Sequence, residues 1–402
     1  MSNLKILLRN NYNLFLGRLT GKKKRKPAIV ATCLLVLGII GIVALYTAQA
    51  YAMFKGGLPP KMNIFHAILT SLSVIVIIGI MRSSANQKHS DSDLLLSLPI
   101  NKRDIIIAKT INKYIFDFFF AFLLFMPYLV IYQIKAGFNA TLFCLGILYV
   151  LLLPLLSIGI SYICDFIISR LFNKMKLGSL LKSFTIILIF VLVMILMLTK
   201  TFTYGSTIDM TDLNAYFKDR PITNFVLAFL FKPNALNITV CLAVAIFPFV
   251  IGLILYSLNY GKTFAGYSSR KKELHFSDSK SPLGLLYKKE LFNYAQTPAY
   301  MINTIIGGIV IVVLGIFLSS LGYDGIALYL GGFTLPKPLL AGIIALAFSV
   351  LISTAPISAS SISLEGKNMW ILKSSPINEN TIFLSKALLH FSILQPCITF
   401  SS

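Results

Sequence analysis

The sequence predicts an all-α, polytopic transmembrane protein, and three observations lead to this prediction. Hydrophobic residues make up 56% of the 402 residues and charged residues only 12%, about half the charged share of an ordinary soluble domain. Apolar runs of the roughly 20 residues that a helix needs to cross a bilayer recur along the chain. Basic residues concentrate in every second segment between these runs. The composition therefore excludes a soluble globular protein, and the hydrophobicity excludes a disordered one.

The first predicted element is an amphipathic helix over residues 3–19. Its apolar side chains recur at helical spacing and its polar ones mark another face, which is typical of a helix lying on the inner leaflet. A run of basic residues follows directly: Lys22, Lys23, Lys24, Arg25 and Lys26. Their charge is expected to hold this end of the chain at the anionic lipids of the cytoplasmic leaflet.

Eight complete membrane spans and the start of a ninth come next. Their predicted bounds are 28–49, 62–81, 114–134, 140–163, 183–199, 238–258, 301–322, 337–360, and 384 to the C-terminus. A second amphipathic helix is predicted just before the seventh span, because Ser281-Pro282 is a favourable helix start. Cysteines lie in or beside the apolar runs without disulfide or metal-ligand spacing, and are interpreted as packing residues.

The distribution of basic residues gives the orientation of these spans. If the N-terminus is inside, the five inner stretches hold 28 of the 36 Lys and Arg residues. An excess of basic residues on the cytoplasmic side is the general rule for membrane proteins. The net charge of +22 therefore indicates membrane topology and contact with anionic lipid, and no nucleic-acid partner is predicted.

An internal repeat is the most specific pattern in the sequence. The loop after the second span and the loop after the eighth both contain P-I-N-x-x-x-I-x-x-x-K, from Pro99 to Lys109 and from Pro376 to Lys386. We call them the first and second PIN loops. Six spans separate the copies, and an even number gives a parallel repeat. A complete second copy would hold six spans, so we interpret the chain as C-terminally truncated, with a naturally short second half as the alternative.

Motifs for catalysis are missing from the predicted spans and loops. Asp117 is the exceptional ionisable residue within the spans, and it is expected to snorkel or to pair with Lys113 rather than to relay protons. Gly261-Lys262-Thr263 resembles the end of a phosphate-binding loop, but the required first glycine is replaced by Tyr256. No catalytic, cofactor-binding or metal-binding residue is predicted, and the chain is not expected to be an enzyme.

The inner end of the eighth span is rich in small hydroxyl residues: Ser349, Ser353, Thr354, Ser358 and Ser361. Several of them share one helical face. They form either the polar lining of a translocation path or a packing face on which helix backbones approach closely. The sequence leaves both interpretations open.

Three segments resemble a known family. The strings LLLSLPINKRDIIIAK (94–109) and SLEGKNMWILKSSPINENTIFLSK (363–386) are similar to cytoplasmic loops of ABC-2-type ABC transporter permeases. They look most like the large bacterial permease subunits built from two fused six-span halves. The string LLYKKELFNYAQTPAYMINTIIGG (285–308) resembles the elbow helix and following span that open each half.

The resemblance implies an architecture and a function. The chain would comprise an elbow helix with its basic cluster (1–27), a first six-span half (28–258), a cytoplasmic linker with a second elbow helix (259–300) and an incomplete second half (301–402). It would be a permease of the bacterial plasma membrane that moves an unidentified substrate, in the direction of export. A separate cytoplasmic ABC ATPase, expected in two copies, would bind ATP and Mg and supply the energy.

The resemblance also implies that a short coupling helix in each PIN loop touches the ATPase. The proline of each motif is expected to start this helix, since its fixed φ suits a helix start. The implied contact residues are Leu98, Pro99, Ile100, Asn101 and Arg103 in the first loop, and Glu365, Gly366, Trp370, Pro376, Ile377 and Asn378 in the second.

Other interpretations of the sequence stay open. Each PIN loop could rest on lipid as an amphipathic turn, and Trp370 either anchors at the membrane interface or fills a groove of a partner. The whole chain could instead be a secondary transporter or channel without an ATPase, or an integral membrane enzyme that acts on lipid.

Overall fold

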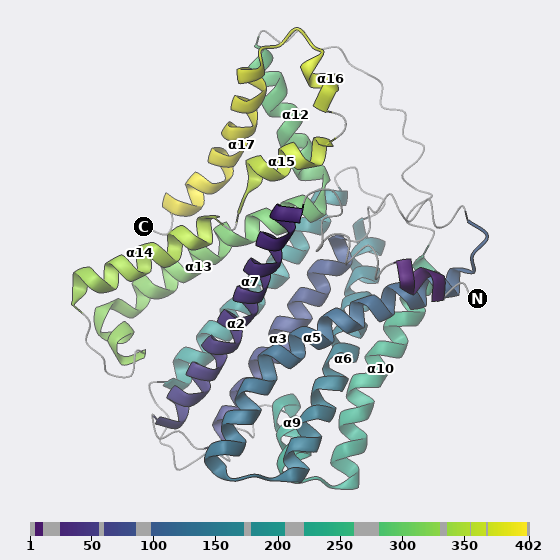
Figure 1. Ribbon diagram of the computed structural model, residues 1–402, viewed down its shortest axis with the longest axis vertical. Helices are drawn as coiled ribbons and strands as arrows, with labels where there is room; N and C mark the ends of the chain where they lie inside the picture. Colours follow the sequence, from purple (N-terminus) through teal and green to yellow (C-terminus); the bar gives the residue numbers. More distant parts are fainter. Residues whose placement is uncertain are drawn as a thin grey trace. The chain divides into compact units, whose positions relative to one another are not determined.

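The computed structural model describes residues 5–10, 25–55, 60–85, 98–172, 178–205, 221–260, 281–329, 336–353, 355–366 and 369–399. Helices are the regular structure of these ranges, and no strand occurs in them (Figure 1). The helices are α2 (Arg25–Lys55), α3 (Pro60–Ala85), α5 (Lys102–Ala136), α6 (Ala140–Phe172), α7 (Gly178–Gly205), α9 (Pro221–Phe231), α10 (Ala235–Asn259), α12 (Pro282–Gln296), α13 (Pro298–Tyr329), α14 (Lys337–Ser353), α15 (Ile357–Glu365), α16 (Met369–Lys373) and α17 (Glu379–Thr399).

Eight candidate membrane spans occur in the described part of the chain. They lie in α2, α3, α5, α6, α10, α13 and α17, and across α14 and α15. The predicted class, an all-α polytopic membrane protein, is thereby confirmed. The described side chains of α7, the predicted fifth span, include a shorter apolar stretch, Leu180–Leu192. Residues 11–24, with most of the basic cluster, and Thr354 lie outside the described residues.

The chain divides into two compact units. Unit 1 contains α2, α3, α5, most of α6, α9 and α10, and unit 2 contains the end of α6, α7, and α12 to α17. Helix α7 therefore groups with the second unit, where it packs against α13. The apolar runs could not predict this grouping, because hydropathy locates spans without saying which of them are neighbours.

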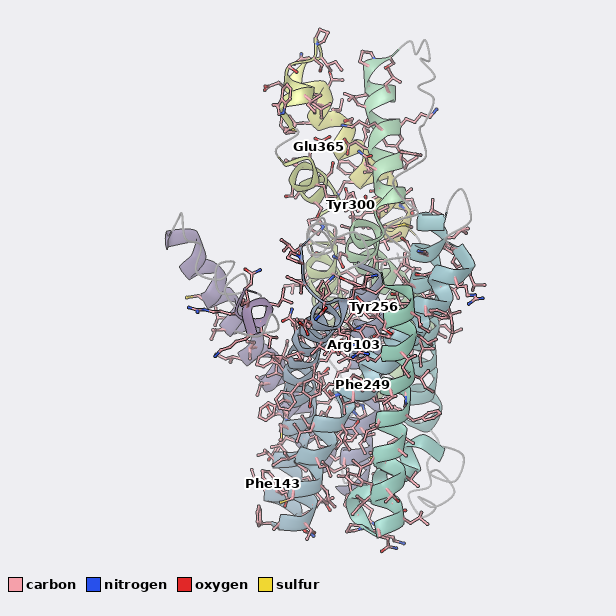
Figure 2. All side chains as sticks on the ribbon, turned by 90° about the vertical axis from the view of Figure 1, so that its right-hand side faces the viewer. Arg103, Phe143, Phe249, Tyr256, Tyr300 and Glu365 are labelled. Carbon is pink, nitrogen blue, oxygen red and sulfur yellow. The ribbon has the colours of Figure 1, made fainter. Side chains whose placement is uncertain are left out.

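Unit 1 is a bundle in which α5 packs against both α2 and α3. Figure 2 shows Arg103, at the start of α5, and Phe143, at the start of α6, toward opposite ends of this bundle. Phe125 and Tyr128 of α5 are fully buried in its core, together with Ile64 of α3 and Phe229 of α9. Large apolar side chains also cover the outside of α2, as expected of helices that face lipid.

Two glycines allow α6 and α10 of unit 1 to approach at backbone distance. A Cβ atom added at Gly252 would lie 2.6 Å from the carbonyl oxygen of Gly159, and one added at Gly159 would overlap the backbone of Pro248. One turn further along, the rings of Tyr162 and Tyr256 stack at 4.3 Å between centroids. Small residues at such a crossing are typical of membrane helices, whose association depends on close packing.

Unit 2 brings the elbow helix α12 against α17 and α13, while α14 lies along α13 (Figure 1). The predicted eighth span, 337–360, consists of two helices instead of one, because α14 ends at Ser353 and α15 begins at Ile357. Pro356 lies at this break, where it has no N–H to donate and its ring obstructs a continuous helix. The break turns the hydroxyl-rich end of the span away from the axis of α14 (Figure 1).

Candidate functional site

The first PIN loop forms a short turn that leads directly into α5. The amide of Ile100 donates to the carbonyl of Leu98 at 2.7 Å, and the amides of Asp104 and Ile105 donate to the carbonyl of Asn101 at 3.0 and 3.4 Å. Asn101 is an extended residue at the helix N-cap, a position that Asn favours. The turn is therefore fixed by its own backbone.

The second PIN loop forms the same turn with the equivalent residues of its motif. The amide of Ile377 donates to Ser375 at 2.7 Å, and those of Thr381 and Ile382 donate to Asn378 at 2.9 and 3.4 Å. Exposure also matches, because the proline and asparagine of each motif are exposed and the isoleucine between them is half-buried. The isoleucine four residues after each asparagine is buried. This correspondence supports the repeat that the sequence indicates.

The predicted coupling helices do not start at the prolines. In the first loop the helix starts at Lys102 and continues without a break through the predicted third span, 114–134, as the 35-residue α5. In the second loop the short helix α16 precedes Pro376. The asparagine of each motif takes the capping position, which leaves the proline outside the helix.

The structure separates the implied contact residues into three groups. Exposed residues are Leu98, Pro99, Asn101, Arg103, Gly366, Trp370, Pro376 and Asn378. Ile100 and Ile377 are half-buried, and Ile100 packs with Leu7, Ile105 and Tyr260, which ties the first turn to the N-terminal amphipathic segment. Glu365 faces inward and takes part in an ion network.

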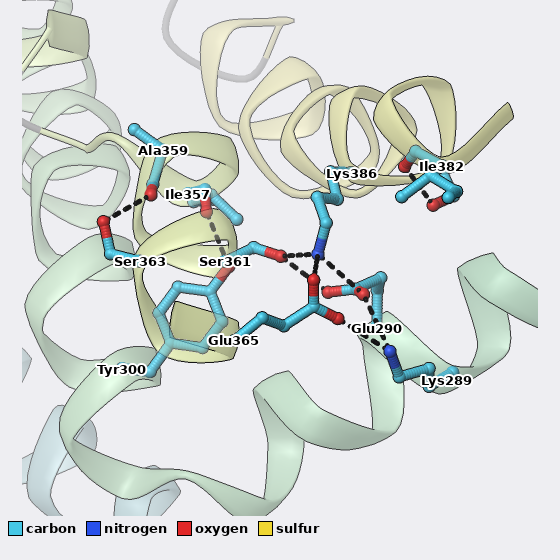
Figure 3. Close-up of polar contacts among 11 residues, drawn as sticks. Lys289, Glu290, Tyr300, Ile357, Ala359, Ser361, Ser363, Glu365, Ile382 and Lys386 are labelled. Carbon is cyan, nitrogen blue, oxygen red and sulfur yellow. Dashed lines mark hydrogen bonds and ion pairs between the residues drawn. The ribbon is translucent and has the colours of Figure 1, made fainter. Parts of the chain in front are cut away.

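This ion network connects three helices of unit 2, and Figure 3 shows its members. We call Lys289, Glu290, Ser361, Glu365 and Lys386 the elbow network. Lys386 of α17 lies 2.9 Å from Glu290 Oε1 of α12 and 2.9 Å from Glu365 Oε2 of α15. Lys289 donates to Glu365 Oε1 at 2.7 Å. Ser361 accepts from Lys386 at 2.8 Å and donates to Glu290 Oε2 at 2.6 Å.

Aromatic hydroxyls tie the same helices together beside the elbow network. Tyr287 of α12 donates to Ser392 of α17 at 3.0 Å, and Tyr300 of α13 donates to the carbonyl of Ile357 at 2.6 Å. Tyr294 of α12 accepts from Thr304 at 3.1 Å, and burial raises the pKa of its hydroxyl to about 12. It therefore stays neutral at physiological pH.

The structure describes four of the five hydroxyl residues of the predicted polar face, and they have different surroundings. Ser361 belongs to the elbow network, whereas Ser349 and Ser353 are exposed and donate to carbonyls of their own helix, those of Ala345 and Val350. Ser358 is half-buried. The structure thus places Ser361 in contacts between helices, while Ser349 and Ser353 bond within their own helix.

Unit 1 contains a second group of buried charges. The carboxylate of Asp117 is buried and lies 3.4 Å from Arg82 of α3, and Ser157 of α6 donates to it at 3.4 Å. Lys113 is also buried and donates to Ser161. The expectation that Asp117 snorkels is wrong, because its carboxylate is buried. Its ion pair within 4 Å is with Arg82 on another helix, and the charge of Lys113 also acts on it, as the spacing of four residues suggested.

These groups provide exposed turns and internal ties between helices. Within the described ranges, no group of three or more His, Cys, Asp or Glu residues could hold a metal ion. Comparisons with protein-family models, with curated proteins and with solved structures found no match to this chain.

Proposed function

We propose that this chain is the membrane-spanning permease subunit of an ABC transporter of the ABC-2 type. It lies in the bacterial plasma membrane with its N-terminus in the cytoplasm and exports a substrate that its residues do not identify. Two copies of a cytoplasmic ABC ATPase bind ATP and Mg, and their ATP hydrolysis drives transport from the cytoplasmic side. Exposed residues of the PIN loops meet these ATPase subunits.

The matched geometry of the two PIN turns carries this proposal. Turns that are far apart in the sequence have the same three backbone hydrogen bonds and the same pattern of exposure. Each leads into an apolar helix, and each such helix packs against an amphipathic segment. A machine with two equivalent ATPase subunits needs two equivalent contacts, whereas a carrier has no evident need for them.

A secondary transporter or channel is the second candidate, and the buried charges of unit 1 favour it. Ionisable residues inside membrane spans often mark ion or substrate pathways. Here Asp117 already has Arg82 and Ser157 as partners, so the group is also explained as a structural tie. An ATPase assay separates the two candidates.

The test starts from the chain purified in mild detergent from its native membranes, with an affinity tag. We expect vanadate-sensitive ATP hydrolysis in the preparation and photolabelling by 8-azido-ATP of a second polypeptide, with this chain unlabelled. Cysteines at Asn101 and Asn378, in a variant without native cysteines, should cross-link to that polypeptide. A cysteine at Phe138, at the other end of α5, is the matched control. A monodisperse chain without a nucleotide-binding partner would refute the permease proposal and favour the secondary transporter.

A further inference from the structure

Within the elbow network, Lys386 is the residue of α17 that joins the helix after the second PIN turn to the elbow helix. Lys386 lies eight residues after Asn378, about two turns into α17. Its partners belong to α12 and α15. The beginning of α17 is therefore tied to both the elbow helix α12 and α15.

Lys386 donates hydrogen bonds to Glu290 and Ser361 and forms an ion pair with Glu365. An ammonium group has three N–H donors, and three oxygens surround this one: Glu290 Oε1, Ser361 Oγ and Glu365 Oε2, at 2.9, 2.8 and 2.9 Å. The lysine side chain is 1% exposed and that of Glu290 is 4% exposed. Burying such charges is costly, so a network of this kind contributes orientation more than stability.

The first copy of the repeat has a different junction. The equivalent lysine, Lys109, is half-buried and donates to the hydroxyl of Tyr260 at 3.0 Å. Its PIN turn meets the N-terminal amphipathic segment through the apolar side chains of Ile100 and Leu7. Apolar contacts are non-directional, whereas the hydrogen bonds from Lys386 to Glu290 and Ser361 fix both distance and direction.

We propose that Lys386 is the positioning residue of the second PIN turn. It holds this turn and the elbow helix α12 as one rigid body, so that α12 moves by the same amount as the turn. The inference rests on the proposed function for the origin of the displacement, but the rigid connection is a property of this chain alone.

Spin labels on two exposed residues test the connection. Labels at Asn378 and Lys288, in a cysteine-free background in lipid nanodiscs, report the distance from the turn to the elbow helix. We expect a narrow distribution in the otherwise unmodified chain and a distribution about twofold broader in Lys386→Met, as local restraint is lost. Lys109→Met, at the equivalent position of the other copy, should leave the distribution unchanged.

A second pair of variants separates positioning from folding. Lys386→Met/Glu290→Gln/Glu365→Gln removes the buried charges together, which costs less stability than leaving one charge unpaired. We expect its thermal midpoint near that of the parent and its distance distribution as broad as in Lys386→Met. Glu365→Gln, on the more accessible carboxylate, should broaden the distribution less. A triple variant that keeps the narrow distribution would overturn the proposal.

Adding ATP and vanadate to the complex with the ATPase tests whether movement of the turn is passed on to the elbow helix. We expect the distance between the labels to stay constant in the parent and to shift in the triple variant, because the turn then moves without the elbow. If no ATPase binds, the distance changes in neither sample and the proposed function fails. The widths of the distance distributions without nucleotide then still decide the role of Lys386. Equal shifts in both samples would refute the rigid connection.

Discussion

Gly159 and Gly252 determine how closely α6 and α10 approach in unit 1. Neither has a side chain to pack, and each leaves room for the backbone of the other helix. Gly342 of α14 provides a contrast, because a Cβ atom there would meet nothing within 4 Å. The same residue type is thus required at one crossing and dispensable on another helix.

Gly252→Ala should destabilise the chain, although alanine is the better helix former. The new methyl group would lie 2.6 Å from the Gly159 carbonyl oxygen, and overpacking of this kind costs about 1–3 kcal/mol. Gly342→Ala should be neutral or stabilising by up to about 1 kcal/mol. Thermal unfolding in detergent measures both variants. Equal midpoints for the two variants would contradict the close approach.

Arg82→Met should be more harmful than the double variant Arg82→Met/Asp117→Leu. The single change leaves the buried carboxylate of Asp117 without its ion partner, and breaking a buried pair costs about 3 kcal/mol. The double change removes both charges and should recover most of the loss. Unfolding midpoints of the parent and the two variants test this order. A double variant less stable than the single one would show that Asp117 does not depend on Arg82.

At the scale of elements, some features follow from local sequence and others do not. Apolar runs predicted the spans because a bilayer-crossing helix needs a long apolar stretch. The break at Pro356 and the helix starts after Asn101 and Asn378 depend on local backbone geometry, and the proline rule placed the starts wrongly. The elbow network could not be predicted, because Glu290 and Lys386 are 96 residues apart and each resembles a polar residue of a surface helix.

Trp370, the single tryptophan of the chain, reports the environment of the second PIN loop. Its side chain is 65% exposed on α16, so its fluorescence should be quenched by aqueous acrylamide when the chain is alone in nanodiscs. Binding of the ATPase should protect it if the loop is the docking surface. Nanodiscs with brominated lipid supply the control. Strong quenching by the lipid, without protection by the ATPase, would identify Trp370 as an interfacial anchor.

For the whole molecule, the charge distribution predicts an orientation that thiol labelling can measure. Asn101 and Phe138 lie just before and just after the ends of α5 and are both exposed. In a cysteine-free background, a membrane-impermeant maleimide should label Phe138→Cys in intact cells. Asn101→Cys should react only after permeabilisation, because basic stretches stay in the cytoplasm. The opposite labelling pattern would invert the topology and place both PIN loops outside the cell.

Helix α5 runs without a break from the first PIN turn into the membrane span, so a tilt at the turn also moves the far end of the helix. Thirty-five residues make a rod of about 50 Å, well beyond the roughly 30 Å thickness of the hydrocarbon core. A tilt of about 5° at one end would carry the other end sideways by about 4 Å. Pro127 lies inside the rod near its far end, where it removes one backbone hydrogen bond of the helix. A small tilt that begins near Asn101 would therefore become a sideways displacement of about 4 Å at the far end of α5.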